Sequence, residues 1–221
     1  MSRRTYNQFC GLAGALDAVG ERWTLLIVRD LSGGPKRYSD LAGSLEGIGT
    51  SLLAARLKQL EVDKVIVRRD LPPPAASTVY ELTDAGWELV DALAPIAVWG
   101  ARHSLSKTRL PDQGFQPEWS LAFVGRAMRN ALSDSAPPAV IEFTIDGSTA
   151  VATVDRHNSA ITPGRAQGEV NASIVTDSAT LAAIVAGRVD LGSALESGQL
   201  RASGDDWVML SLASALSQVA H

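Results

Sequence analysis

The sequence predicts an α+β protein of two domains, 1–111 and 112–221, in which a mainly helical half precedes a half that mixes strands with helices. Helical spacing of apolar residues dominates the first half, whereas apolar and polar residues alternate in parts of the second. A polar segment rich in Pro and Gly, residues 106–117, separates the two. Net charge also differs, at +2 for residues 1–110 and −6 for residues 111–221. Such asymmetry is typical of domains that meet different partners.

Composition excludes several classes of protein. The 221 residues contain no apolar run of about 18 residues and no N-terminal signal, so we expect a cytoplasmic chain without a membrane partner. A single cysteine excludes an internal disulfide, and three widely spaced histidines give no zinc spacing. There is no phosphate-binding glycine loop and no nucleophile elbow. We therefore expect no metal, no cofactor and no enzyme activity.

Helices followed by a hairpin are expected in order along the first half. The predicted helices cover 10–19, 21–31, 38–45 and 50–62. In the last of them Leu53, Leu57 and Leu60 have the i, i+4, i+7 spacing of a buried face. Two β segments, 65–69 and 78–82, then flank a triple-proline loop. This order is that of a winged helix-turn-helix domain.

The chemistry of the 50–62 helix favours DNA binding. Opposite its leucines lies a face of small and cationic residues, which would allow close approach to the floor of the major groove. Further cations precede the shorter helix and lie on the hairpin, where a wing would touch the DNA backbone. The residues expected to bind double-stranded DNA are Arg37, Ser39, Thr50, Ser51, Ala54, Arg56, Lys58, Arg68 and Arg69. The alternative is that these are ordinary solvated charges on a small helical domain.

Four segments carry a family resemblance, at residues 10–31, 37–41, 53–61 and 80–86. The most distinctive part is Trp-Thr-Leu-Leu at 23–26 followed by Arg-Asp-Leu at 29–31. In combination, these segments resemble the HxlR-type winged-helix transcription regulators over residues 6–105. The resemblance implies a homodimeric, sequence-specific DNA-binding protein.

Three positions depart from the family's pattern. Cys10 is followed by Gly11 where members often have Pro. The recognition helix opens with Gly-Thr-Ser at 49–51 instead of Ser-Pro-Lys, so no target sequence can be carried over. Lys64 occupies a turn position where Gly is frequent, and we expect a strained or altered turn there.

A long helix is expected over residues 84–105, with a kink at Pro95. Its apolar side is formed by Trp87, Val90, Leu93, Ala94, Ala97, Val98 and Ala101. Because this stripe is wide for one small domain, we expect it to pack against a second copy, together with the helix at 12–19. The alternative is packing beneath the second domain.

Cys10 allows two interpretations. Its flanks, Phe9, Gly11 and Leu12, are typical of a core and favour a buried structural cysteine. In some HxlR-type proteins a cysteine at this place senses electrophiles or oxidants, so the second interpretation is a redox-sensing thiol. A reactive thiol needs exposure and a cationic neighbour.

The second half alternates strands with helices. Strands are predicted at 141–145, 150–154, 170–174 and 200–202, and helices begin near 118, 177, 192 and 205. The segments at 172–176, 181–190 and 194–205 resemble the sterol-carrier-protein-2-like domains, over residues 118–219. This resemblance implies a five-stranded sheet, with helices on one side, enclosing an apolar tunnel for lipids or fatty acyl chains.

An apolar small-molecule effector is the partner expected for this half, since a regulator needs a second site whose occupancy biases DNA binding. The residues expected to line its pocket are Phe123, Met128, Phe143, Ile184, Val185, Leu191, Leu195, Trp207, Met209 and Leu210. The alternative is that they are only core. For the whole chain we expect a ligand-responsive regulator. The alternative is a lipid-carrier or interaction protein in which the winged helix mediates protein contacts and the sterol-carrier-protein-2-like half is structural.

Overall fold

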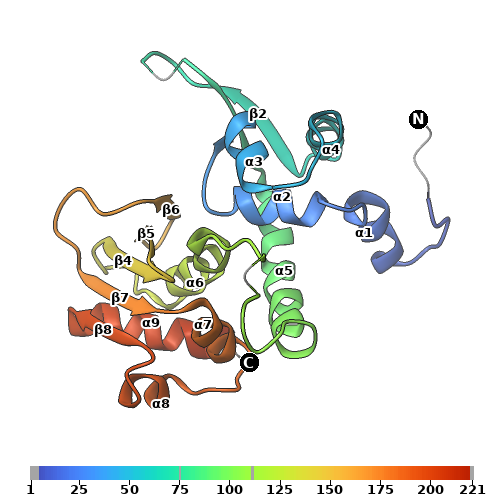
Figure 1. The fold of residues 1–221 in the computed structure, drawn as a ribbon. Coiled ribbons are helices and arrows are strands. Elements are labelled where there is room, and N and C mark those ends of the chain that lie inside the picture. Colours follow the sequence, from blue (N-terminus) through green and yellow to red (C-terminus); the bar gives the residue numbers. More distant parts are fainter. Residues whose placement is uncertain (1–4, 75, 111, 220–221) are drawn as a thin grey trace. The chain divides into compact units, whose positions relative to one another are not determined.

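The computed structural model describes residues 5–74, 76–110 and 112–219 (Figure 1). The chain divides into two compact units between Leu93 and Ala94, inside the long helix α5 (Asp84–His103). This division falls earlier than the expected boundary near residue 112. The second half of α5 belongs with the second unit because Arg102 donates a hydrogen bond to the Ala186 carbonyl oxygen, 3.1 Å away.

The first unit contains helices, a short strand and a hairpin. Before α5 its elements are α1 (Gly11–Val19), α2 (Thr24–Leu31), β1 (Lys36–Arg37), α3 (Tyr38–Ser44), α4 (Thr50–Val62), β2 (Ile66–Asp70) and β3 (Thr78–Leu82). The strands form an antiparallel sheet in the order β1-β3-β2. The β2–β3 hairpin extends beyond the helices that precede it, as Figure 1 shows. The predicted winged helix-turn-helix order is confirmed, with β1 as an addition.

The core of the first unit forms as the leucine spacing predicts. Leu53, Leu57 and Leu60 of α4 are almost completely buried, together with Ile27 and Leu31 of α2. Removing large aliphatic side chains from water stabilises a fold by about 1.5–3 kcal/mol each. The opposite side of α4 is consequently turned outward.

Two left-handed residues set the ends of helices in this unit. Trp23 has φ 79°, which delays the start of α2 to Thr24, three residues later than predicted. Lys64 has φ 58°, so the altered turn expected from the missing glycine is present. A side chain at such a φ is strained, and the surrounding structure must hold it there.

Helix α1 is less buried than its apolar spacing predicts. Leu12 and Leu16 are exposed, whereas Ala13 and Val19 are buried. The apolar face of α1 is therefore only partly covered within one chain.

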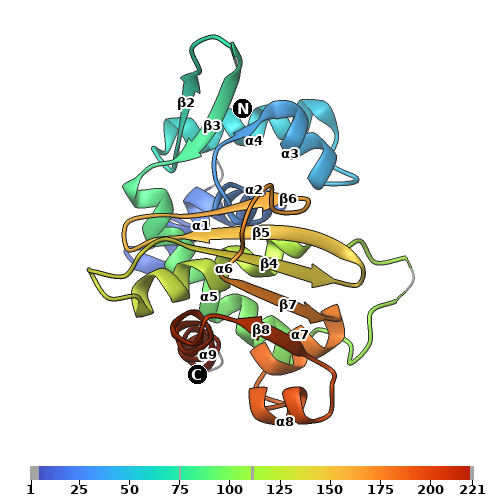
Figure 2. The same ribbon diagram turned by 90° about the vertical axis from the view of Figure 1, so that its left-hand side faces the viewer.

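The second unit consists of helices on a five-stranded sheet (Figure 2). After α5 its elements are α6 (Pro117–Ala131), β4 (Ala139–Ile145), β5 (Ser148–Val154), β6 (Ser159–Pro163), β7 (Ala172–Thr176), α7 (Ser178–Val185), α8 (Leu191–Glu196), β8 (Arg201–Gly204) and α9 (Asp206–Val219). The strand order is β6-β5-β4-β7-β8, with β4 and β7 parallel and the other neighbours antiparallel. The mixed sheet domain expected in this half is present.

One face of this sheet carries the apolar core. Ile141 and Phe143 of β4 are buried against the cluster to which Leu121 of α6 and Leu212 of α9 belong. Residues between them, such as Glu142, are half-buried on the other face. This alternation is typical of a sheet with one covered face.

No helix in the described ranges is long and apolar enough to cross a bilayer.

Candidate nucleic-acid interface and apolar pocket

The outward side of α4 is the centre of the candidate interface. Its small and cationic members are all exposed, while the leucines on the other side of the helix are buried. We call this set the α4 face; it consists of Thr50, Ser51, Ala54 and Lys58. Small side chains allow close approach of a helix to base edges, and Lys58 can meet a phosphate.

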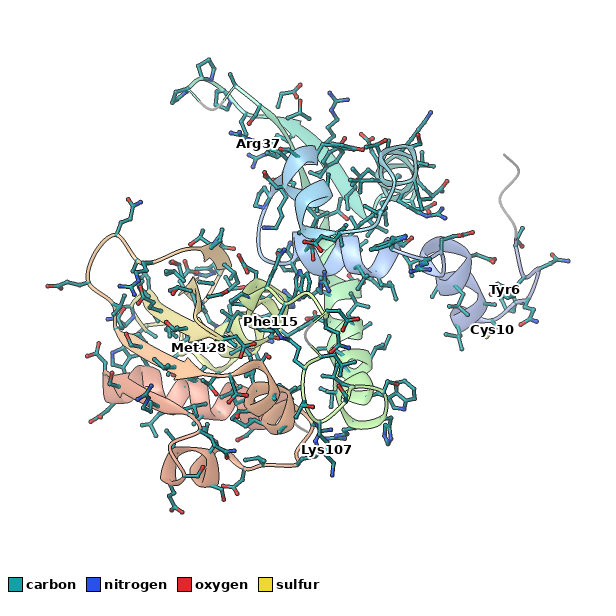
Figure 3. All side chains as sticks on the ribbon, viewed as in Figure 1. Tyr6, Cys10, Arg37, Lys107, Phe115 and Met128 are labelled. Atoms are coloured by element: carbon teal, nitrogen blue, oxygen red, sulfur yellow. The ribbon has the colours of Figure 1, made fainter. Side chains whose placement is uncertain are left out.

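The start of α4 is held from α3. The Tyr38 hydroxyl donates a hydrogen bond to the Thr50 carbonyl oxygen at 2.8 Å. The backbone N–H of Arg37 donates to the Asp40 carboxylate at 2.9 Å, which fixes the first turn of α3. Arg37, labelled in Figure 3, and Ser39 are both exposed. The structure thus brings two of the predicted DNA contacts to the N-terminal end of α3, the helix that precedes α4.

Arg56 differs from the rest of the predicted set. Its Nη2 atom lies 2.7 Å from the Oε2 atom of Glu21, and its side chain is only 21% exposed. Its Nε atom is buried without a hydrogen-bond partner in the described structure. The guanidinium is therefore engaged by the α1–α2 turn, and we leave Arg56 out of the α4 face.

A buried carboxylate joins α2 to α3. Asp30 pairs with Arg29 at 2.7 Å and accepts a hydrogen bond from the Ser44 hydroxyl. Burial lowers the pKa of the Arg29 guanidinium, and the charge of Asp30 opposes that shift. An unpaired buried carboxylate would be costly, so this group holds the helix-turn-helix elements together.

The two arginines of the wing have different environments. Arg69 forms an ion pair with Glu81, with 2.8 Å between Nη2 and Oε2. Arg68 is exposed and lies opposite Tyr80 in the β2–β3 register. Neighbouring residues of a strand point to opposite faces, so the two guanidinium groups leave the hairpin on different sides.

An apolar pocket lies inside the second unit, between the sheet, α6, α9 and the short helix α8. Of the residues expected to line it, Phe143, Leu191, Leu195 and Met209 do so. Thr176 is the polar residue of the lining, and its hydroxyl already donates to the Gln199 carbonyl oxygen at 3.0 Å. The cavity measures about 30 Å³.

The remaining residues of the expected lining lie elsewhere. Met128 and Ile184 are core residues outside the pocket, and Phe123, Val185 and Trp207 are half-buried outside it. Leu210 is 73% exposed, because it lies on the outer side of α9. Figure 3 shows Met128 within the second unit. Helical spacing identified apolar residues here without separating cavity wall from core.

Comparison with known proteins shows to which family the first half of the chain is similar. The family model described as HxlR-like helix-turn-helix matches residues 18–108. The HTH-type transcriptional regulator YodB of Bacillus subtilis is 32% identical over 88 residues, which are 40% of this chain and 79% of YodB. This chain belongs to the HxlR-like helix-turn-helix family.

Other relatives of this HxlR-like chain match a similar share of it. The HTH-type transcriptional regulator YvaP of Bacillus subtilis is 35% identical over 85 residues, or 38% of this chain and 79% of YvaP. The solved structure of reduced YodB is 30% identical and covers 44% of this chain and 96% of that chain, with a TM-score of 0.40. The family match ends at residue 108, so the five-stranded sheet lies beyond it.

Helix α5 of the HxlR-like chain has two apolar stripes. Most of the stripe predicted to meet a second copy is buried within the chain, as at Val90, Leu93 and Val98. A second stripe, which we call the α5 seam, has the spacing 4-3-4-3-4; it consists of the apolar residues Ala85, Leu89, Ala92, Ile96 and Trp99 and ends at His103. Ile96 is 56% and Trp99 60% exposed, and the rings of Trp99 and His103 lie 5.4 Å apart. The spacing of apolar residues predicted the helix but not this second stripe.

The expectation that Cys10 is buried is wrong. Cys10 and its neighbour Phe9 are exposed, because the chain before α1 leaves the core, and Figure 3 shows Cys10 and Tyr6 at this end. The backbone N–H groups of Ala13 and then Leu12, at the start of α1, lower the pKa of the Cys10 thiol. The cations nearest to it in sequence, at positions 3 and 4, lie outside the described residues.

Proposed function

We propose that this chain is a DNA-binding transcription regulator that acts in the cytoplasm as a homodimer. The observation that carries the proposal is the α4 face, which is small, cationic at Lys58 and turned outward by three buried leucines. A helix of this kind reads base edges in the major groove, while nearby cations hold the phosphates.

In this proposal each part of the interface has its own task. The α4 face meets the bases, whereas Arg37, the N-cap of α3, and Ser39 in the first turn of α3 meet the backbone. Arg68 extends from the wing to the backbone or the minor groove, whereas Arg69 stays with Glu81. Arg56 supports the position of α4 through Glu21.

The homodimer is supported by the α5 seam. Apolar residues at alternating intervals of four and three form the stripe by which two helices pack as a coiled coil. Exposed tryptophan and isoleucine on such a stripe favour burial against an equivalent helix. The exposed leucines of α1, Leu12 and Leu16, add to the apolar surface available to a second copy. A dimer would present two α4 faces to paired half-sites.

The second unit is proposed to be a sterol-carrier-protein-2-like domain that binds an apolar small molecule. Among the described residues its pocket is lined by aliphatic side chains, Phe143, Met209 and one polar side chain, Thr176, which is already hydrogen-bonded. No charged side chain in the part of the chain that the structure describes lines it, so the ligand would be an uncharged chain or ring. Because ligand pockets usually measure about 300–1,000 Å³, the 30 Å³ cavity must open to bind one.

Selection from a random pool of DNA duplexes tests the regulator proposal. The purified chain should enrich a sequence with two half-sites about 10 base pairs apart, centre to centre. A variant with Ser51→Asp and Lys58→Asp, which places acids on the α4 face, should enrich nothing. A variant with two acids on the outer face of the second unit, Thr162→Asp and Ser203→Asp, is the matched control and should enrich the same sequence. Lack of enrichment by the unaltered chain, together with binding of a lipid, would favour the carrier alternative.

A further inference from the structure

We propose that two arginine side chains, Arg102 and Arg188, couple the apolar pocket to helix α5. The Arg102 Nε–H donates to the Ala186 carbonyl oxygen at 3.1 Å, and an Arg188 Nη1–H donates to the Ala101 carbonyl oxygen at 2.7 Å. We call these two hydrogen bonds the clasp. The inference rests on the proposed ligand binding by the second unit and concerns how that binding is transmitted.

Each hydrogen bond of the clasp is donated to a carbonyl oxygen at the C-terminal end of a helix, where carbonyl groups lack hydrogen-bond donors from within the helix. Ala101 lies in the last turn of α5, and Ala186 is the C-cap of α7. The carbonyl groups at the C-terminal end of a helix have no partner within it, and a guanidinium there also complements the helix dipole. Ala101 and Ala186 are both buried, so losing either hydrogen bond would leave a carbonyl oxygen poorly solvated.

The clasp lies next to the pocket wall along the chain. Residues 186–190 connect α7 to α8, and Arg188 is three positions before Leu191. Leu191 and Leu195 of α8, with Leu181 of α7, line the pocket. A movement of α8 therefore acts directly on the segment that carries Arg188.

Helix α8 is the wall that can yield when the pocket fills. The other walls are strands of the sheet, the long helices α6 and α9, and Leu181 of α7, and all of them contribute buried residues to one core. Helix α8 has six residues, and its Leu195 is 41% exposed. Since the cavity of about 30 Å³ cannot hold a ligand of ordinary size, occupancy must displace one wall.

Displacement of α8 then reaches the exposed seam of α5. When residues 187–190 move with α8, the hydrogen bond from Arg188 to Ala101 is lost and the last turn of α5 loosens. That turn carries His103, which packs on Trp99 of the seam. Allosteric coupling requires two distinct sites that both shift the equilibrium of one element between two arrangements. Occupancy of the pocket would thus change the packing of the dimer and, through it, the affinity for DNA.

Overfilling the pocket by mutation tests the clasp without knowing the ligand. Ala213 of α9 lines the cavity, so Ala213→Phe imitates an occupied pocket. Hydrogen exchange is measured at the amides of Ser104 and Leu105, which both donate to the Gly100 carbonyl oxygen at 2.9 Å. We expect exchange there at least threefold faster in Ala213→Phe, and also faster in Arg188→Ala. The double variant should exchange no faster than Arg188→Ala, because the clasp is already open.

Matched variants distinguish the loss of the clasp from a general destabilisation of the second unit. Arg201 is an exposed arginine on β8, and Arg201→Ala should leave exchange at Ser104 and Leu105 unchanged. Arg188→Lys keeps one donor and should restore part of the slow exchange. If Ala213→Phe does not fold, Ala213→Val overfills less and should give the same pattern with smaller changes.

The proposal is overturned if overfilling alters exchange in α8 but not at Ser104 and Leu105, or if the two substitutions act additively. This experiment contains no DNA. A negative result would therefore reject the clasp without affecting the regulator proposal, which the duplex selection tests. Conversely, intact coupling in a chain that enriches no duplex would reject the regulator proposal alone.

Discussion

Arg56 of α4 forms an ion pair with Glu21, with 2.7 Å between Nη2 and Oε2. The pair ties the turn between α1 and α2 to helix α4 at a residue outside the α4 face. An arginine on a helix proposed to read DNA is thus held by an acid of the same chain. Its task is to position the helix, and the two following predictions separate this task from DNA contact.

Arg56→Ala should lower the free energy of unfolding by about 1 kcal/mol, since it removes a partly buried side chain with its ion pair. Glu21→Gln should cost less, about 0.5 kcal/mol, because the carboxylate is well exposed and screened. Urea denaturation followed by circular dichroism measures both. Lys58→Ala, on the same helix but exposed, should change the value by less than about 0.5 kcal/mol. If Lys58→Ala lowered the free energy of unfolding as much as Arg56→Ala, the positioning role of Arg56 would be contradicted.

Lys58→Ala should reduce the salt dependence of DNA binding. Each phosphate contact contributes about 0.9 to the slope of log K against log salt, so a homodimer that loses two contacts should lose about 1.8. Fluorescence anisotropy of a labelled duplex between 50 and about 200 mM salt gives the slope. Lys107→Ala, an exposed lysine outside the interface, is the control and should leave the slope unchanged. Equal slopes for Lys58→Ala and Lys107→Ala would show that Lys58 does not contact DNA.

The structure of the wing predicts that the neighbouring residues Arg68 and Arg69 contribute differently to the affinity for duplex DNA. Arg68→Ala should weaken duplex binding by about five- to tenfold, because an exposed cation loses its phosphate. Arg69→Ala should weaken it by less than about twofold, since Arg69 is paired with Glu81. The same anisotropy titration compares them at one salt concentration. The assignment of the wing is wrong if the order of the two effects is reversed.

Charge on the α5 seam should dissociate the homodimer. Trp99→Asp or Ile96→Asp would place a carboxylate in an apolar helix interface, where an unpaired charge is strongly unfavourable. Light scattering after size exclusion should report a dimer for the natural chain and a monomer for either variant. Leu210→Asp alters an apolar residue that is more exposed than either and lies outside the seam, so it should leave the dimer intact. A dimer that persists in both seam variants would require a different interface.

Cys10 should react with iodoacetamide at lower pH than an ordinary thiol. The N–H groups at the start of α1 favour the thiolate, so its pKa is lowered. Since only the thiolate is alkylated, the pH at half-maximal rate should shift downward in the folded chain. The same chain in urea is the control, because Cys10 is its single cysteine. Coincident pH profiles in the two states would exclude an activated thiol.

Local spacing predicted the elements whose burial is decided within one unit. The three leucines of α4 are buried as expected because their i, i+4, i+7 pattern allows only one inward face. Strand β6 was missed. It has one buried aliphatic residue, Ile161, and ends at Pro163, so it resembles a loop until its pairing with β5 is seen.

Burial that depends on distant elements could not be predicted from spacing. Leu12 and Leu16 share the pattern of a core face, but nothing in the described chain covers them. The direction of Arg56 depends on Glu21, which lies 35 positions earlier in the sequence. The pocket presented the same difficulty, since Phe143 faces the cavity and Ile184 does not, although both are buried.

The border between the units inside α5 has a consequence for dissecting the molecule. A protease that cut in the polar segment after α5 would release a C-terminal fragment without residues 94–103, which belong to the second unit. That fragment would lack Ala101 and Arg102, and with them the partners of Arg188 and Ala186. Fragments designed for separate crystallisation should therefore begin at residue 94, where the natural border lies.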